Sequence, residues 1–250
     1  MQKQIIILAA AIMPFAFFSC SKESIKTQQA NNSATTDEAF ATQKPGTIPI
    51  IKIKDGLTGM FEFNGNLKEK TGQLADAVPT IPGVTTYTTD RKGMVNKAIR
   101  FTGRYGLNIL KVPTQPNSSV AAWVKYTSVP APGVILPFLF SNRGPNFDQH
   151  GTHYAGVIIT PVTTSVYSSP MDDNWHHLVA TYDGNDLRFY VDGKYIGSSN
   201  NPSQYNPYTL TYNVGYMPFI NSPLWQGCMD DLSFYSRTLS DADVQQLYNL

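Results

Sequence analysis

The stretch from Trp175 to Gly197, WHHLVATYDGNDLRFYVDGKYIG, decides the fold. Apolar side chains alternate with others along residues 178–182 and again along residues 187–191, which is the period-2 pattern of β-strands. Residues 183–186 and the Asp192-Gly193 pair supply the chemistry of tight turns. The stretch therefore predicts a three-stranded antiparallel meander.

The first strand of this meander is apolar on both faces, because Leu178, Val179 and Ala180 follow one another. We expect it to run through the middle of a sheet, whereas the second strand has one clean apolar face. This combination favours a β-sandwich over a helical fold.

The stretch also resembles the laminin-G-like members of the concanavalin A-like lectin and glucanase superfamily, in which a Trp-His-His strand leads into a Tyr-Val-Asp-Gly hairpin. Four further segments fit the same family in the same order, namely residues 59–67, 96–103, 120–124 and 227–240. The resemblance covers roughly residues 57 to 250. It implies an all-β jelly-roll β-sandwich of two antiparallel sheets, and it says less about activity, since fold and function are separable.

Further elements are expected around this core. Ser240 is a good N-cap, with Asp241 and Asp243 in the first turn, and it predicts one short C-terminal helix that packs Val244 and Leu247 against the sandwich edge. Strands are expected near residues 57–63, 97–101, 105–110, 119–126, 154–160, 163–167, 208–216 and 227–235, and loops near residues 64–83, 113–117, 129–137 and 141–148.

Residues 1–19 have the features of a secretory signal: Lys3, then an apolar run to Phe18, too short for a permanent membrane span. Ser19-Cys20 resembles the lipobox of bacterial lipoproteins, in which Cys20 becomes the lipid attachment site. The Ser21-Lys22-Glu23 that follows resembles the surface-export signals of Bacteroidetes lipoproteins. The alternative is an ordinary secreted protein with an incidental cysteine.

Residues 20–50 are rich in Gln, Asn, Ser and Thr, too polar to bury a core, and predict a flexible tether. The remaining residues 51–250 are expected to form one sandwich domain. A lipid-anchored domain held off the outer membrane or cell surface follows, with the lipid anchor as its only contact with the membrane.

Charge and cysteine content exclude some partners. Without Lys3 of the signal, 18 basic and 18 acidic residues remain, and this balance argues against nucleic-acid binding. An acylated Cys20 would leave Cys228 alone, which we interpret as a small buried hydrophobe.

Catalysis is not expected. Glycosidases need a pair of carboxyl groups, and the adjacent aspartates 172–173 and 230–231 would face opposite sides of a strand. No Gly-x-Ser-x-Gly nucleophile elbow is present, and His150 and His153 lack a third zinc ligand nearby. His176 and His177 match a structural position of the family and are expected to be buried and hydrogen-bonded.

Asp230 is expected on the same strand face as Leu232 and Phe234, where a buried carboxylate needs a partner. The partner could be an arginine such as Arg100 or a structural calcium ion. No other cofactor is expected.

A binding role is the function that the composition supports. Loops rich in Tyr, Asn and Gly offer the aromatic faces and planar hydrogen-bonders that sugar sites use. The candidates are Asn142, Arg143, Asn146, His153 and Tyr154 in one expected loop, followed by Tyr216 and Trp225. The expected partners are an oligo- or polysaccharide and surface glycan-uptake proteins. The alternatives are that these loop residues are merely solvated, that the protein is a protein-interaction or adhesion module, or that it is a glycoside hydrolase.

Overall fold

The computed structural model describes residues 54–113, 116–159, 163–202, 209–218 and 224–250. The predicted signal of residues 1–19, the tether of residues 20–50 and Cys20 lie outside these described residues. Within the described ranges, no helix combines the length and apolar character required to cross a membrane.

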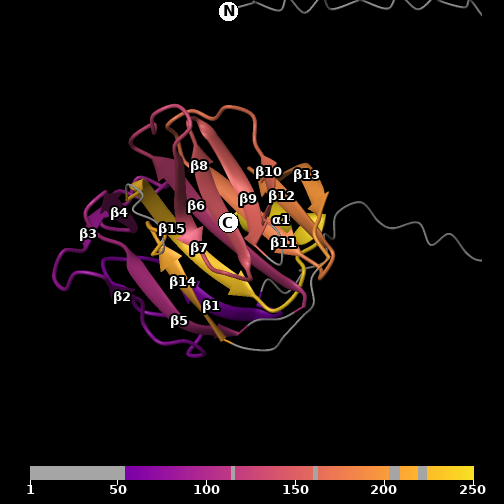
Figure 1. Cartoon of the computed structure of the whole chain (residues 1–250). Coiled ribbons are helices and arrows are strands. Elements are labelled where there is room, and N and C mark those ends of the chain that lie inside the picture. Colours follow the sequence, from indigo (N-terminus) through magenta and orange to yellow (C-terminus); the bar gives the residue numbers. More distant parts are fainter. Residues whose placement is uncertain (1–53, 114–115, 160–162, 203–208, 219–223) are drawn as a thin grey trace, which may run out of the picture. The chain divides into compact units, whose positions relative to one another are not determined.

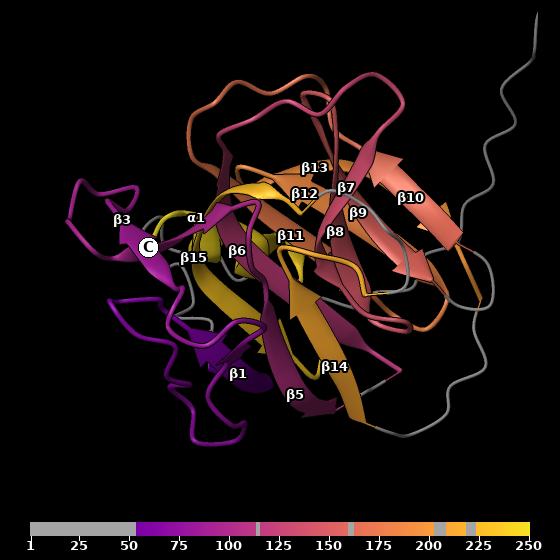
Figure 2. The same ribbon diagram turned by 60° about the vertical axis from the view of Figure 1, so that its left-hand side comes forward.

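Two antiparallel sheets lie face to face, as Figures 1 and 2 show. In sheet A the strand order is β13–β12–β11–β6–β15–β4–β3, and β1 pairs with β15; in sheet B the order is β10–β9–β8–β7–β14–β5–β2. Sheet A contains β1 (Leu57–Phe61), β3 (Thr86–Thr88), β4 (Ala98–Thr102), β6 (Ser118–Tyr126), β11 (His176–Tyr182), β12 (Asp186–Val191), β13 (Lys194–Asn200) and β15 (Gln226–Tyr235). Sheet B contains β2 (Val78–Pro79), β5 (Leu107–Pro113), β7 (Ile135–Phe140), β8 (Pro145–His150), β9 (His153–Ile159), β10 (Thr163–Tyr167) and β14 (Thr209–Val214). This is the predicted jelly-roll β-sandwich.

The predicted meander is confirmed as β11, β12 and β13. Strand β11 lies between β12 and β6, as its two apolar faces indicated. Asp192 and Gly193 both have positive φ, +50° and +74°, which is the backbone of a tight hairpin. Leu178 and Ala180 point into the core between the sheets, and Val179 points to the outer face of sheet A.

The main core fills the space between the sheets and is rich in aromatic side chains. Trp225 is fully buried there and stacks on Phe138, with 4.7 Å between ring centroids. Burial of this apolar surface is the main favourable contribution to folding.

Helix α1 (Asp241–Tyr248) begins at the predicted N-cap. Ser240 and Asp243 form a capping box, in which the Asp243 N–H donates to the Ser240 hydroxyl and the Ser240 N–H donates to the Asp243 carboxylate. Val244 and Leu247 join Val179 in a second buried apolar cluster on the outer face of sheet A. The predicted position at the sandwich edge is therefore wrong: α1 covers part of a sheet face, behind sheet A in Figure 2.

In sheet B, the first half of β7 and most of β8 lie where the sequence predicted loops, at residues 129–137 and 141–148. Pro137 is inside β7, where the register shifts between Pro137 and Leu139. A proline has no N–H for the ladder, and this irregularity lets the strand accommodate it. Residues 145–150 form β8, so most of the predicted binding loop is one arm of a hairpin with β9.

Candidate functional site

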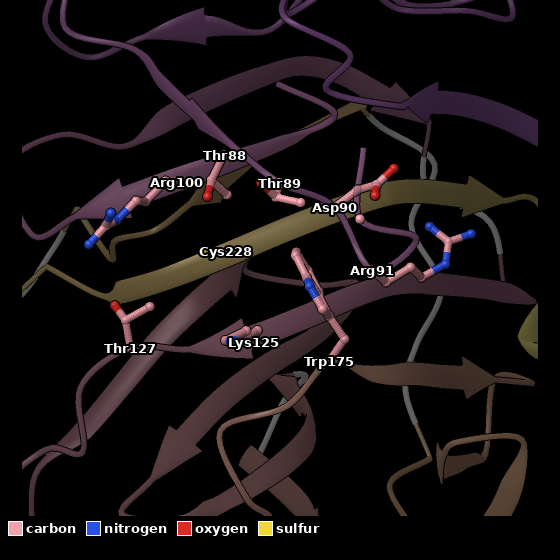
Figure 3. A pocket seen from close by; sticks show the side chains of 10 residues that line it. Thr88, Thr89, Asp90, Arg91, Arg100, Lys125, Thr127, Trp175 and Cys228 are labelled. Carbon is pink, nitrogen blue, oxygen red and sulfur yellow. The ribbon is translucent and has the colours of Figure 1, made fainter. Parts of the chain in front are cut away.

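A groove of about 490 Å³ crosses the outer face of sheet A beside the area that α1 covers. Trp175 lines one side, residues 88–91 line the other, and the floor carries Arg100, Lys125 and Cys228 (Figure 3). We call it the Trp175 groove. Its volume is within the usual range for small-ligand sites.

The floor is set by the register of three neighbouring strands. On β15, Cys228 is paired with Arg100 of β4 on one side and with Lys125 of β6 on the other. Paired residues in a sheet point to the same face, so all three side chains point outward. Cys228 is small and almost fully buried, and this leaves a hollow between its two longer neighbours.

Trp175 stands on the side of the groove where the chain enters β11, and it is partly exposed. Figure 3 shows its indole directed across the floor toward the strand that carries Cys228. The preceding turn is fastened by Asp172, whose carboxylate accepts hydrogen bonds from the Asn174 N–H at 2.8 Å and from Nε2 of His176 at 3.0 Å. These hydrogen bonds order the chain on both sides of Trp175.

His176 is the second anchor of this turn. Its Nδ1 donates to Asp192 at 2.8 Å while its Nε2 donates to Asp172. Burial lowers the pKa of His176, but the hydrogen bonds and charges of Asp192 and Asp172 outweigh burial and raise it. The predicted buried, hydrogen-bonded role is confirmed for His176.

The neighbouring His177 differs. Its backbone N–H donates to the Asp192 carboxylate and its carbonyl accepts the Asp192 N–H, but its buried side-chain Nδ1 has no hydrogen-bond partner in the described part of the chain. Burial lowers its pKa to about 4, so the ring is neutral, and it packs against both Trp123 and Tyr248.

Arg91 closes the far end of the groove. Its Nη1 lies 2.7 Å from Asp230 and 2.8 Å from Asp231, and its guanidinium stacks 4.7 Å from the centroid of Trp123. The predicted arginine partner of Asp230 is therefore Arg91 and not Arg100. The prediction missed this partner because Arg91 lies in the loop after β3, which is distant from Asp230 in the sequence.

Two expectations about the aspartates of β15 are wrong. The strand bulges between Asp230 and Ser233, and Asp231 has a positive φ of +47°. The bulge turns Asp230 away from the core face of Leu232 and lets both carboxylates reach Arg91, although neighbours in a regular strand face opposite ways.

The residues around Asp230 do not fit a calcium ion. One carboxylate oxygen receives the Arg91 guanidinium and the other receives the Asp231 N–H. No group of three or more potential metal ligands exists among the described residues. Burial, with the charge of Asp231 adding to it, raises the pKa of Asp230 to about 7, despite the opposing charge of Arg91.

A second hollow of about 330 Å³ lies on the other side of Arg91. Its lining is mainly apolar and includes Leu57, Met60, Trp123 and Leu247. Arg91 and its two aspartates thus separate a polar groove from an apolar pocket.

Three of the predicted binding residues are in the interior. Asn146, Tyr154 and Trp225 are each 0% exposed. Asn146 exchanges hydrogen bonds with the backbone of Ser141, the Tyr154 hydroxyl accepts the Tyr126 N–H, and Trp225 Nε1 donates to Gln149. The expectation that Tyr154 lies outside the core is wrong, since the chain there is a buried strand.

The other four predicted residues do not come together. Asn142 and Arg143 are exposed in the turn before β8, whereas His153 is the first residue of β9, beyond the other end of β8, and its Nδ1 donates to the Ser168 carbonyl. Tyr216 follows β14, and its hydroxyl donates to Asn108. The hairpin places the members of the expected site at opposite ends of a six-residue strand.

Arg100 and Lys125 were not among the predicted binding residues, although the sequence pattern around each indicates an outward-facing side chain. Arg100 lies between the apolar Ile99 and Phe101, and Lys125 lies between the apolar Val124 and Tyr126, so the alternation predicts that both cations face away from the core. What the alternation could not give was that the two cations stand on either side of Cys228.

The family follows from a match of residues 107–245 to the laminin-G-type model of the concanavalin A-like lectin/glucanases superfamily. The chain belongs to this superfamily. The matched part runs from β5 into α1, and β1 and β4 outside it complete sheet A by pairing with β15. The superfamily includes both sugar-binding and sugar-cleaving proteins by name, so membership leaves the activity of this member open. No curated protein matches the chain.

Solved structures share the superfamily fold. Domain 4 of AbnA, a GH43 extracellular arabinanase from Geobacillus stearothermophilus in complex with arabinotriose, superposes with a TM-score of 0.57 at 19% identity, over 77% of this chain and 98% of that one. The binding domain of botulinum neurotoxin DC in complex with SialylT gives a TM-score of 0.62 at 12% identity, over 79% of this chain and 52% of that one. This chain therefore spans about half of the toxin domain, and at these identities the likeness shows the fold.

Proposed function

We propose that the protein is a non-catalytic, surface-anchored lipoprotein that captures oligo- or polysaccharides in the Trp175 groove. The observation that carries the proposal is a partly exposed tryptophan, next to a hydrogen-bonded turn, above a floor of polar and cationic side chains. Sugar rings offer C–H faces to an indole and hydroxyls to planar and hydroxyl hydrogen-bonders.

Each part of the groove has a task in this proposal. The indole of Trp175 would stack on a sugar ring, and the ring hydroxyls would bond to Arg100, Lys125 and the threonines at the rim, Thr88 and Thr127. Asp90 would accept a hydroxyl hydrogen through its Oδ2, since its Oδ1 is held by the N–H groups of Lys92 and Met94.

The absence of catalysis is supported by the carboxylates. Asp90 is the one carboxylate that the described lining of the groove contains, whereas glycosidases require two that flank the bond. Asp230 is buried and paired with Arg91 at the far end of the groove. The two similar structures are complexes with arabinotriose and with SialylT, and they favour a saccharide as ligand of this chain.

The test is binding of a neutral and acidic oligosaccharide panel by calorimetry. Trp175→Ala is expected to weaken binding at least about tenfold, which corresponds to roughly 1.4 kcal/mol of lost stacking and burial. Tyr167→Ala, which removes an exposed aromatic on β10 of sheet B, is the matched control and should bind like the unaltered protein. Equal affinity in both variants, or binding to protein partners alone, would point to the adhesion alternative.

The anchoring rests on Ser19-Cys20, outside the described residues. Cys20→Ala is expected to move the protein from the membrane fraction to the soluble fraction, or to stop its maturation, because the acylated thiol is lost. Mass spectrometry and fractionation measure this directly. An unchanged mass and unchanged fractionation would contradict lipid anchoring and leave the groove proposal intact.

A further inference from the structure

We infer that the Trp175 groove selects acidic saccharides, with a carboxylate or sulfate ester of the sugar seated between Arg100 and Lys125. The inference rests on the proposed function and adds the chemical class of its ligand. Uronates and sulfated sugars share the required chemistry, an anionic group attached to a stackable ring.

The position of the two cations is fixed by the sheet. Both are directly paired with Cys228, from strands on either side of it, and all three point outward. The backbone of Arg100 is held further, because its carbonyl accepts hydrogen bonds from the hydroxyls of Thr86 and Tyr105. An anion above Cys228 would meet a guanidinium on one side and an ammonium on the other.

Both charges are available for a ligand. Neither Arg100 nor Lys125 is in an ion pair within the described ranges, whereas Arg91 and Arg237 are both paired with aspartates. Two unpaired cations above one small buried residue repel each other, and an anion between them relieves that repulsion.

The two charges also act on the pKa of Cys228, which lies between them on the floor. Burial raises the pKa of the Cys228 thiol, and the charges of Arg100 and Lys125 oppose this rise. The anionic group of a ligand above Cys228 would be attracted by the same two positive charges.

The remaining groups at this end suit the same ligand. Thr88 and Thr127 stand at the rim beside the cations, and each offers a hydroxyl donor. The one acidic residue of the lining, Asp90, lies at the opposite end next to Arg91 (Figure 3). The two ends of the groove therefore differ in charge. The end with Arg100 and Lys125 is positive, and at the other end the charge of Arg91 is balanced by aspartates.

The experiment compares matched probes on the full chain. Trigalacturonate and its methyl ester have the same sugar chain, and esterification replaces each charged carboxylate by a neutral methyl ester. Parallel arms use glucuronate and mannuronate oligomers and a sulfated oligosaccharide. For the acidic probe that binds best, we expect at least tenfold tighter binding than for its neutral form, and a loss of this preference in Arg100→Gln/Lys125→Gln. Charge-assisted hydrogen bonds are salt-sensitive here, so higher ionic strength should also weaken binding.

Lys194→Gln, which removes an exposed cation at the far edge of sheet A, is the control for net charge and should keep the preference. Three outcomes would overturn the inference. The acidic and neutral forms could bind equally, the double variant could retain the preference for the acidic form, or no acidic probe could bind at all. If neutral sugars then still bind, and Trp175→Ala weakens that binding, the proposed saccharide-binding function stands without the preference for acidic sugars. If Trp175→Ala leaves all saccharide binding unchanged, neither the proposed function nor the inference holds.

Discussion

The outer face of sheet A has two regions with opposite character, although the same strands run through both. Under α1, β6 and β11 present Ala121 and Val179, and the helix buries them. Farther along, β6 presents Lys125 and β15 presents Cys228, and they line an open groove. The alternation of a strand specifies which side chains face outward, but the presence of a covering element decides whether that face becomes core or binding surface.

The boundary between the two regions is the cluster of Arg91 with Asp230 and Asp231. The bulge in β15 brings both carboxylates to one guanidinium, and that guanidinium lies on Trp123. Bulges commonly re-aim side chains beside functional sites. Here the bulge ends the polar groove and begins the apolar pocket.

The largest expected effect tests the covered region. Leu247→Ala should lower the free energy of unfolding by about 2 to 3 kcal/mol, because it removes a buried side chain from the cluster that joins α1 to sheet A. Urea unfolding measures the change. Saccharide binding in the groove should remain the same, since the groove lies outside the helix contact.

Leu250→Ala is the matched control for this variant, because the same residue type is 60% exposed there. Its effect should stay within about 0.5 kcal/mol. A Leu247→Ala protein as stable as the control would contradict the assignment of this half of the face to the core. A loss of sugar binding in Leu247→Ala would show that the two regions are not independent.

The sequence predicts the local features of both regions. The meander of β11–β13 and the Ser240 cap depend on near neighbours in the chain, on alternation and on turn chemistry, and they are confirmed. Resemblance to a known family supplied the two-sheet arrangement, and the family match agrees with it.

The sequence could not predict features that depend on distant pairings. The floor joins Arg100, Lys125 and Cys228 through the order of three strands, which no local pattern contains. Tyr154 and Trp225 look like loop aromatics beside polar residues, yet a hairpin and an inter-sheet hydrogen bond place them in the core. A bulge is likewise invisible to a period-2 pattern, so the aspartates of β15 were assigned to the wrong faces.

The smaller expected effect tests the boundary. Arg91→Gln removes the cation from Asp230, which is 3% exposed, and a buried carboxylate without its partner is costly when ionised. Because burial already holds the pKa of Asp230 at about 7 when Arg91 is present, loss of Arg91 raises it further. A proton can then relieve the cost.

The sign of the pH dependence follows from this rise. A carboxyl group whose pKa is raised by folding contributes stability below its ordinary pKa, near 3.8, and loses that contribution as the pH rises through its folded pKa, about 7 for Asp230. In Arg91→Gln the loss continues to higher pH, so the variant should be nearly as stable as the unaltered protein at pH 5 and about 1 to 2 kcal/mol less stable at pH 8. Urea unfolding at both pH values measures the free energy of unfolding.

The control is the double variant Arg91→Gln/Asp230→Asn, which has no charge to bury at this position and should lose most of this pH dependence. If Arg91→Gln is destabilised equally at pH 5 and pH 8, Arg91 acts through its stacking on Trp123 and not through its charge.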